Sequence, residues 1–275
     1  MIKIVNKFTC PEQELEEPEN ILVEIKNFNV WFNDFHVLKD ICVRFREKSI
    51  NCIIGPSGSG KSTLIRSVNR INDDIDGFIH HGDVHFNGYT RGRSIYHKDI
   101  DVNNLRTKVG MVFQKPCVFP KSIYENTLLG VKYLKKHSKQ EKLQIVEENL
   151  NAVSLWKEVS SRLHEKATTL SIGQQQRLCI ARTLAVKPTV ILLDEPTSSL
   201  DPVSTYAIEK LMLQLKEQYT IIFITHNIVQ AKRIADYLVF MCEGQVIEEG
   251  TKEKLFSNPD KQQTKDYLSN EYCEC

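Results

Sequence analysis

Residues 49–63 read Ser-Ile-Asn-Cys-Ile-Ile-Gly-Pro-Ser-Gly-Ser-Gly-Lys-Ser-Thr, and this stretch decides the fold. The run from Ser49 to Ile54 is short and apolar, as a central parallel strand buried on both faces requires. A Gly-x-x-x-x-Gly-Lys-Ser loop follows directly, and the residues from Ser62 to Arg70 have a helical pattern. Strand, loop and helix come in the order that a phosphate-binding loop demands. A glycine-rich turn that does not bind phosphate would not explain why the loop ends in Lys-Ser-Thr.

Each residue type in this loop has a chemical reason. The glycines let the backbone wrap around phosphate groups without Cβ clashes, and the helix that follows points its free N–H groups at them. Lys61 supplies a positive charge for the β- and γ-phosphate oxygens, and Ser62 supplies a hydroxyl ligand for Mg²⁺. We therefore predict that this loop binds a nucleoside triphosphate together with Mg²⁺. The residues expected to hold the nucleotide are Gly55, Pro56, Ser57, Gly58, Ser59, Gly60, Lys61, Ser62 and Thr63.

A second apolar strand ends in two carboxylates. Residues 189–196 read Thr-Val-Ile-Leu-Leu-Asp-Glu-Pro, so Asp194 and Glu195 emerge at the sheet edge where α/β proteins bind ligands. Asp194 is suited to hold Mg²⁺, directly or through water, and Glu195 to polarise an attacking water. Taken alone, two acids after a strand indicate a solvated strand end equally well. Downstream of a phosphate-binding loop, they predict the metal-binding and hydrolytic residues of a nucleotide site.

Alternating strand and helix patterns predict an α/β fold with a mainly parallel sheet, an antiparallel β subdomain and an inserted α-helical subdomain. Strands are expected over residues 21–32, 37–46, 49–54, 82–88, 189–194 and 220–225, with a hairpin of 237–242 and 245–249 around Glu243-Gly244. Two helical faces are expected to be buried, one with Leu143, Val146, Leu150 and Val153 and one with Ile208, Leu211, Met212 and Leu215. The helix-rich stretch from about 116 to 167 is the predicted insert.

The predicted domain organisation is simple. Residues 1–20 carry five glutamates around two prolines, which is typical of a solvated acidic leader. Residues 21–268 are expected to form one ATPase domain, and residues 269–275 a C-terminal tail.

Composition excludes several classes of protein. The formal net charge of +1 lacks the basic bias that non-specific nucleic-acid binding usually requires. No segment approaches the roughly 18 to 20 apolar residues of a membrane span, so a membrane role must come through a partner. The eight cysteines show no metal-type spacing, and Cys52 and Cys179 are expected to be buried thiols in a reducing cytosol.

A third motif lies at residues 170–177, which read Leu-Ser-Ile-Gly-Gln-Gln-Gln-Arg. Ser171 is a good N-cap residue and Gln174 lies three positions later, so the pair predicts a capping box at the start of a helix. The N-terminus of that helix is a second place where an anion can bind. An ordinary capped helix explains the pattern equally well by itself.

Together these motifs resemble those of the ATP-binding-cassette (ABC) family, whose signature normally reads Leu-Ser-Gly-Gly-Gln. The resemblance covers about residues 21–268 and implies a P-loop NTPase core of the RecA-like type. It identifies Gln114 with the Q-loop, as a catalytic and metal-binding residue, and Asp201 with the D-loop. It likewise identifies His226 with the catalytic switch histidine.

The resemblance also assigns an aromatic residue to the adenine base. Phe32 lies where the family places the ring that stacks on adenine, with Trp31 as the competing candidate and an ordinary core aromatic as the alternative. The chain departs from the family pattern at two positions. Ile172 replaces the first signature glycine, and Phe32 replaces the usual tyrosine.

In this family ATP joins two cassettes. The phosphate loop of one copy and the signature residues Ser171, Gly173 and Gln174 of the other enclose the nucleotide. The resemblance therefore implies a homodimer in which Lys61, Gln114, Glu195 and His226 are catalytic, and Ser62, Gln114 and Asp194 bind the metal. It further implies two transmembrane permease subunits as partners, with this chain peripheral on the cytoplasmic face of the cell membrane.

Several stretches, some within these motifs and some outside them, resemble the phosphate-import ATPases of bacterial ABC transporters, namely Val112–Pro116, Phe119–Asn126, Gln174–Arg182, Thr225–Asn227 and Phe256–Pro259 with Gln263–Tyr267. The resemblance implies import of inorganic phosphate delivered by an extracytoplasmic binding protein. An importer subunit for another solute, such as a polar amino acid, is the alternative. A soluble ABC ATPase acting on ribosomes or DNA is disfavoured, because the chain has one cassette, no sustained heptads, no zinc spacing and no basic patch.

Overall fold

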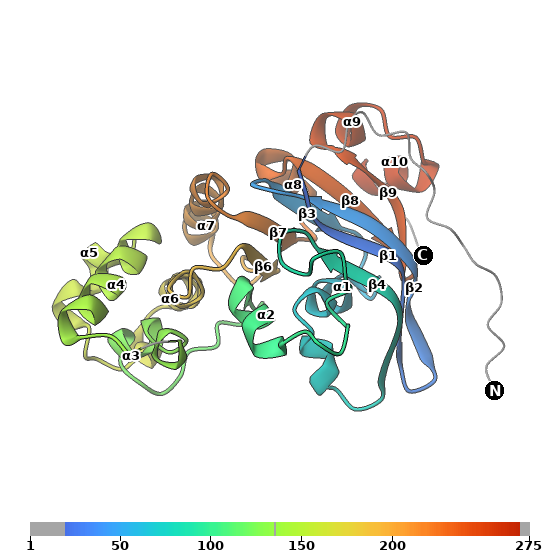
Figure 1. Ribbon diagram of the computed structural model, residues 1–275. Helices are drawn as coiled ribbons and strands as arrows, with labels where there is room; N and C mark the ends of the chain where they lie inside the picture. The colour runs from blue at the N-terminus through green and yellow to red at the C-terminus, as the bar shows by residue number, and fades with distance from the viewer. Residues whose placement is uncertain (1–19, 135, 270–275) are drawn as a thin grey trace. The chain divides into compact units, whose positions relative to one another are not determined.

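The computed structural model describes residues 20–134 and 136–269 of the chain (Figure 1). These residues form two compact units. The first unit contains residues 20–47, 51–101 and 226–269, and the second contains residues 48–50 and 102–225. Apart from Asn20 and Ser269, the predicted leader and C-terminal tail lie outside the described residues.

The first unit contains a three-stranded antiparallel sheet with the order β2-β1-β4 (Figure 1). Its strands are β1 (Ile21–Phe32), β2 (Phe35–Arg46) and β4 (Phe78–Phe86). The predicted alternation of β2 is confirmed, since Ile41, Val43 and Phe45 are all buried. Strand β4 begins at Phe78, earlier than the expected residue 82, because its pairing with β1 continues to the end of that strand.

The first unit also contains a parallel pair of strands and a hairpin. Strand β3 (Ile50–Ile54), whose residues from Asn51 onward belong to this unit, pairs in parallel with β8 (Tyr237–Cys242), and every residue of both strands is buried. The hairpin to β9 (Gln245–Thr251) forms as predicted, with φ of 47° at Glu243 and 80° at Gly244. Two consecutive positive φ values are what a two-residue type I′ turn requires. The helices of this unit are α1 (Lys61–Val68), α8 (Ile228–Ile234), α9 (Lys252–Ser257) and α10 (Gln262–Leu268), with a 3₁₀ turn at Ile71–Asp74.

The second unit is built on three parallel strands, β5 (Val109–Val112), β6 (Val190–Asp194) and β7 (Thr220–Ile224), with β6 between the other two. Strands β6 and β7 are buried along their whole length, which explains their continuous apolar runs. Their helices are α2 (Val102–Lys108), α6 (Ile172–Leu184) and α7 (Pro202–Leu215). The predicted face of α7 is confirmed, since Ile208, Leu211, Met212 and Leu215 are buried.

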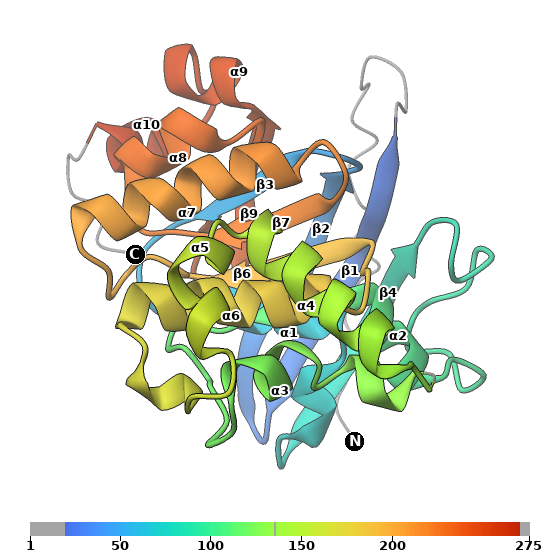
Figure 2. The same cartoon turned by 90° about the vertical axis from the view of Figure 1, so that its left-hand side faces the viewer.

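The stretch predicted as a helical insert is rich in helix. It contains α3 (Ile123–Thr127), α4 (Lys139–Ala152) and α5 (Trp156–Val159), with 3₁₀ turns at Val131–Tyr133 and Ser160–Arg162 and a further one at Ala167–Thr169. Helices α3 and α4 both contact α6, and Figure 2 shows α4 lying beside it. The predicted burial of Leu143 is wrong, because burial on α4 begins at Val146 and leaves Leu143 46% exposed.

Two expectations from composition can be compared with the structure. In the described part of the chain, no helix is long and apolar enough to cross a membrane. Cys52 and Cys179 are buried thiols, as predicted. Cys42 and Cys242 each take part in a disulfide bond, which the sequence did not predict, because cysteine pairing cannot be deduced from spacing alone.

Candidate functional site

The phosphate loop of the first unit is organised around the side chain of Lys61. Its ammonium group Nζ donates hydrogen bonds to Gly55 O at 2.8 Å, Pro56 O at 2.6 Å and Ser59 Oγ at 3.4 Å. Lys61 is the first residue of α1 and is only 6% exposed. The loop therefore curls around one positive charge at a helix N-terminus, an arrangement suited to phosphate oxygens.

Two loop glycines are required by close approaches within the first unit. At Gly55, where φ is 146°, a Cβ atom would lie 2.0 Å from Met241 O of β8. At Gly60, where φ is 90°, a Cβ atom would lie 2.7 Å from Leu38 Cδ2 of β2. Glycine at these positions thus holds the loop against its own unit, besides leaving room for phosphate.

Phe32 and Trp31 lie on opposite faces of the antiparallel sheet. The Phe32 ring packs on Phe78 with their centroids 5.8 Å apart, whereas Trp31 stacks on His36 at 4.2 Å. Phe78 also contacts Tyr96, whose hydroxyl donates a hydrogen bond to a carbonyl of α1. Because α1 begins at the phosphate loop, Phe32 is on the loop's side of the sheet and Trp31 is not. This arrangement favours Phe32 as the candidate for base stacking.

In the second unit, Gln114 is brought to Glu195. Gln114 Nε2 donates hydrogen bonds to Glu195 Oε2 and to Ser198 Oγ, both at 3.2 Å, and Ser198 Oγ donates to Glu195 O at 3.1 Å. Ser198 was not predicted as a site residue, because nothing in the sequence pattern separates its hydroxyl from that of Ser199. Asp194, the last residue of β6, is 3% exposed.

The backbone at Glu195 is unusual. Its φ of 46° lies in the left-handed region, which residues other than glycine rarely adopt. Such a conformation persists only where the surroundings hold it, and it is common at functional sites. The turn after β6 therefore constrains the backbone of Glu195, while the hydrogen bond from Gln114 holds its carboxylate.

The predicted capping box at the start of α6 is confirmed. Ser171 Oγ accepts a hydrogen bond from Gln174 N at 3.3 Å, and Gln174 Oε1 accepts one from Ser171 N at 3.0 Å. Ile172, the first residue of α6, is 53% exposed. Gly173 is buried, and a Cβ atom there would lie 2.6 Å from Ser204 Oγ of α7. Glycine therefore allows the close approach of α6 to Ser204 of α7.

Asp201 begins α7 as its N-cap. Its Oδ1 atom accepts hydrogen bonds from Val203 N at 2.9 Å and Ser204 N at 3.0 Å, and its Oδ2 atom accepts one from Ser204 Oγ. These bonds, first of all the one from the Ser204 hydroxyl, lower the pKa of Asp201. The carboxylate charge lies at a helix N-terminus, where it is favourable. A contact between Asp201 and nucleotide stays a prediction.

His226 lies just beyond β7 and is exposed. The next residue, Asn227, caps α8 by accepting a hydrogen bond from Gln230 N at 3.0 Å. This cap fixes the backbone immediately after His226, the predicted switch histidine. Its catalytic role stays a prediction.

The predicted site residues are divided between the two units. The first unit holds Phe32, Gly55, Pro56, Ser57, Gly58, Ser59, Gly60, Lys61, Ser62, Thr63 and His226. The second holds Gln114, Ser171, Gly173, Gln174, Asp194, Glu195 and Asp201. Hydrogen bonds join Lys61 to the loop, Gln114 to Glu195, and Ser171 to Gln174.

The predicted metal ligands have suitable chemistry for Mg²⁺. They are a hydroxyl (Ser62), a carboxylate (Asp194) and an amide (Gln114), all of which offer the oxygen ligands that Mg²⁺ prefers. Gln114 Nε2 is turned to Glu195, so the amide oxygen is the atom that a metal would use. Among the described residues, no group of three or more His, Cys, Asp or Glu could hold a metal ion. A Mg²⁺ ion that is bound together with substrate phosphates typically has only a small number of protein ligands.

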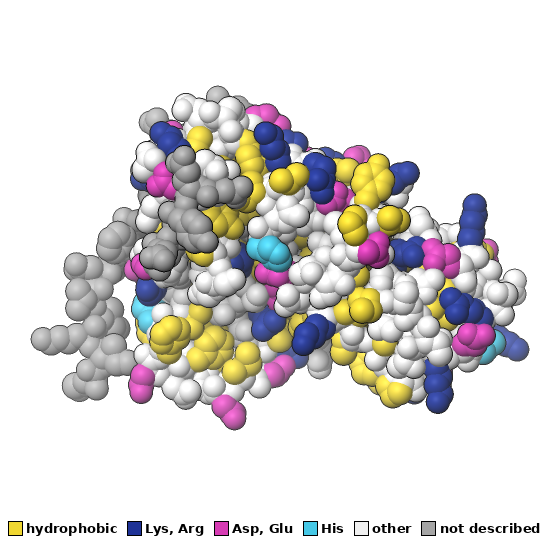
Figure 3. All heavy atoms as spheres, turned by 180° about the vertical axis from the view of Figure 1, so that it is seen from behind, with side chains coloured by type: hydrophobic (Ala, Val, Ile, Leu, Met, Phe, Trp, Pro, Cys, Tyr) yellow, Lys and Arg dark blue, Asp and Glu magenta, His cyan; other side chains and the backbone are white. Residues whose placement is uncertain are grey.

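Charges of both signs are exposed on the face drawn in Figure 3, where lysine and arginine side chains lie among aspartate and glutamate side chains. On this face the charges are mixed, unlike the basic stripe typical of proteins that bind nucleic acid.

The chain is similar to known proteins over most of its length. A model of the family described as "ABC transporter" matches residues 38–198. The "Phosphate import ATP-binding protein PstB 2" of Bacillus licheniformis is 48% identical over 257 residues, covering 94% of this chain and 92% of that protein. The "Phosphate import ATP-binding protein PstB" of Thermotoga maritima is 48% identical over 248 residues, covering 90% and 97%.

Solved structures support the same fold. CbiO1 from Clostridium perfringens, part of the ABC transporter complex cbiONQ, has a TM-score of 0.75 at 28% identity and covers 87% of this chain and 92% of its own. A dimeric post-hydrolysis structure of the ATP-binding cassette MJ0796, bound to ADP and Pi, has a TM-score of 0.70 at 29% identity, covering 84% and 99%. The predicted P-loop NTPase fold, with an antiparallel β subdomain and an inserted helical subdomain, is confirmed.

Proposed function

Because the chain belongs to the ABC transporter family, we propose that it is the ATP-hydrolysing subunit of a transporter that imports inorganic phosphate. The observation that carries the proposal is the 48% identity, over 94% of the chain, to a protein named for phosphate import. Fold alone would support only ATP hydrolysis, because one fold hosts many functions. The assignment of phosphate as the transported ion is based on the likeness to those relatives, since no residue of the candidate site needs to contact that ion.

Nucleotide binding is assigned first to the phosphate loop. Lys61 would exchange its hydrogen bonds with loop carbonyls for bonds to the β- and γ-phosphates, while the N–H groups of the loop and of α1 hold the remaining oxygens. Phe32 would stack on the adenine ring, which needs a π-face and no tyrosine hydroxyl. The structural support is the position of Phe32 on the loop's side of the sheet.

Ser62, Asp194 and Gln114 are the proposed ligands of Mg²⁺. When bound, the ion neutralises charge on the phosphate oxygens during transfer. Glu195 would accept a proton from the attacking water, and its strained backbone together with the hydrogen bond from Gln114 holds its carboxylate in one direction. His226 would donate to the γ-phosphate from the end of β7.

The proposed working unit is a dimer. The phosphate loop of one copy and the start of α6 of the other would enclose ATP, with Ser171 Oγ and Gly173 N donating to the γ-phosphate and Gln174 and Asp201 completing the contact. Ile172 N precedes the first hydrogen bond of α6, so its N–H can still donate even though glycine is replaced. Residues 21–268 would work together as one ATPase domain.

Two permease subunits in the membrane are the proposed partners, with the chain peripheral on the cytoplasmic face. An extracytoplasmic phosphate-binding protein would act on the complex indirectly. Closure of the ATP dimer would move the permeases, and hydrolysis would reopen it.

Uptake of labelled phosphate tests the proposal. Cells that lack their own phosphate-import ATPase would express the matched permeases and binding protein, together with this chain or its Glu195→Gln variant. We expect the unmodified chain to restore phosphate uptake and the Glu195→Gln variant to fail to restore it. Failure of the unmodified chain, with complex assembly and ATPase activity confirmed, would overturn the phosphate assignment and favour another solute, such as a polar amino acid.

A further inference from the structure

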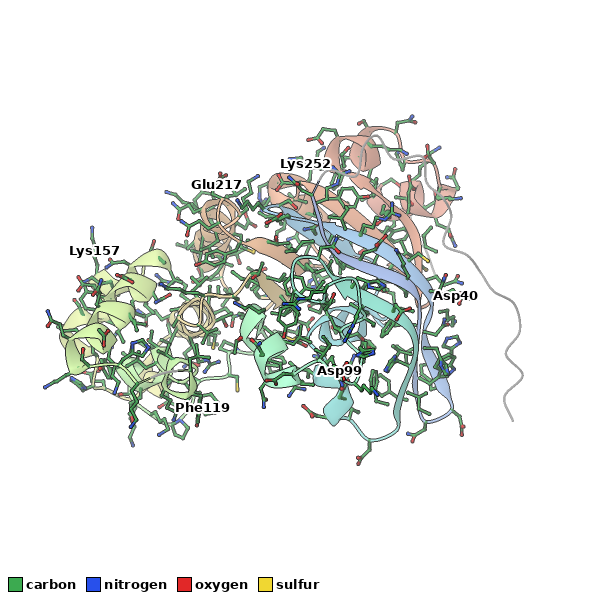
Figure 4. The ribbon with its side chains drawn as sticks, in the orientation of Figure 1. Asp40, Asp99, Phe119, Lys157, Glu217 and Lys252 are labelled. Atoms are coloured by element: carbon green, nitrogen blue, oxygen red, sulfur yellow. The ribbon has the colours of Figure 1, made fainter. Side chains whose placement is uncertain are left out.

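The side chain of Glu158, on α5, joins the start of α6 through three hydrogen bonds. Its Oε1 atom accepts from Arg177 Nη1 at 2.8 Å, and its Oε2 atom accepts from Arg177 Nη2 at 3.2 Å and from Gln174 Nε2 at 2.7 Å. Lys157, labelled in Figure 4, marks the same helix. A two-point bond between guanidinium and carboxylate is among the stronger and more directional polar contacts in proteins.

The contact with Glu158 determines which way the amide of Gln174 faces. A carboxylate only accepts hydrogen bonds, so it must face the Nε2 group of that amide. The Oε1 atom then faces Ser171 N, which can only donate. If the Gln174 amide were reversed, its oxygen would face the Glu158 carboxylate and its N–H groups would face the N–H group of Ser171. Glu158 therefore selects the orientation of Gln174 that completes the capping box.

Arg177 ties this arrangement to the chain before α5. Its Nη1 atom also donates to Ser154 O at 2.8 Å, and its side chain is only 16% exposed. Burial would raise the pKa of Glu158, but the hydrogen bonds from Arg177 and Gln174 outweigh it and hold that pKa below its ordinary value. The pair is thus charged at neutral pH and fixes α5 to the first turns of α6.

We propose that Glu158 and Arg177 are positioning residues for ATP-driven dimer closure. They hold Gln174 in the orientation that caps Ser171, and so aim the Ser171 hydroxyl and the Gly173 N–H at the nucleotide of a second copy. This inference rests on the proposed function, in which the start of α6 contacts ATP across the dimer. Neither Glu158 nor Arg177 needs to touch ATP itself.

Dimerisation of the full chain over a series of ATP concentrations tests the inference. All variants carry Glu195→Gln, which is expected to trap the closed dimer, and dimer is measured by analytical ultracentrifugation. Binding of a fluorescent ATP analogue to dilute, monomeric protein is measured in parallel. That second readout depends on the phosphate loop and reports whether the variant is folded. Glu147→Ala, at an exposed position of α4, is the matched control.

With Glu158→Ala, the ATP concentration for half-maximal dimerisation is expected to rise about tenfold, as for the loss of charge-assisted hydrogen bonds. Analogue binding to the monomer should stay within about twofold of the control, because the phosphate loop is unchanged. Arg177→Met should have a similar effect. Because both residues act through one network, the double variant should need about as much ATP as the single variant with the larger effect. Its increase should not equal the product of the two single increases.

Three results would overturn the inference. The first is dimerisation of Glu158→Ala at the ATP concentration of the control, and the second is multiplied effects in the double variant. The third is loss of analogue binding by the monomer, which would mean that the pair supports folding and does not aim Ser171. A chain carrying only Glu195→Gln that binds ATP but never dimerises would instead contradict the proposed function.

Discussion

Replacing Gly173 by alanine tests the close approach of α6 and α7 on which the geometry of the signature segment depends. The added Cβ would lie 2.6 Å from Ser204 Oγ and 3.0 Å from Ser204 Cβ. Rotation of the Ser204 side chain about its Cα–Cβ bond would relieve the first contact, but it would break the hydrogen bond to Asp201 and leave the second contact in place.

The expected size of the effect follows from two opposing contributions. Overpacking of this kind costs about 1–3 kcal/mol, whereas alanine is favoured over glycine in a helix by about 1 kcal/mol. Gly173→Ala should therefore lower the free energy of unfolding by about 0–2 kcal/mol. In a Ser204→Gly background both opposing atoms are gone, and the same change should raise that free energy by up to about 1 kcal/mol.

Urea unfolding followed by circular dichroism measures both effects. The four proteins of the cycle are the unmodified chain, the two single variants and the double variant, compared by midpoint at constant m-value. The expected coupling energy is about 1–3 kcal/mol. Gly173→Ala should lower the free energy of unfolding when Ser204 is present and raise it when Ser204 is replaced by glycine. An equal loss of stability from Gly173→Ala in both backgrounds would refute the packing argument.

Three further predictions concern the first unit. Gly55→Ala should destabilise the chain by about 3 kcal/mol or more, since the new Cβ would lie 2.0 Å from a backbone oxygen; a thermal unfolding midpoint equal to that of the unmodified chain would contradict this. Lys61→Ala should weaken ATP binding at least about tenfold in a fluorescence titration, and unchanged affinity and hydrolysis would rule out its role in the loop. Burial raises the pKa of Glu249 from 4.5 to about 7 although Arg44 N donates to it. The folded chain keeps this proton at pH values where the unfolded chain has lost it, so stability should fall as pH rises from 4.5 to about 7. Glu249→Gln should flatten this part of the profile in urea titrations at several pH values, and an unchanged slope would contradict the assignment.

The sequence predicts those parts of the fold that local chemistry decides. The apolar run at β3, the glycine loop before α1 and the capping box at Ser171 all depend on residues close together in the chain. The same holds for the hairpin at Glu243-Gly244, where positive φ values require a particular turn. Such features can be read from spacing, because their partners are at most a few residues away.

Features that depend on distant residues were missed. Ser198 meets Gln114 across 84 positions, and Glu158 meets Gln174 across 16, so neither contact leaves a periodic signal. Strand β5 has only four residues, too short for a pattern to distinguish it. The strained φ of Glu195 is imposed by its surroundings and not by residue type, since glutamate does not favour that conformation.

The most direct test of the account is ATP hydrolysis by the reconstituted transporter. The chain would be assembled with its two permeases in lipid vesicles. ATP hydrolysis would be measured with the phosphate-loaded binding protein, with the ligand-free binding protein, and without the binding protein. Stimulation by the phosphate-loaded protein alone, abolished by Glu195→Gln, is the predicted result. Stimulation that ignores phosphate, or that persists in the variant, would contradict the claim that this chain hydrolyses ATP through Glu195 to import phosphate.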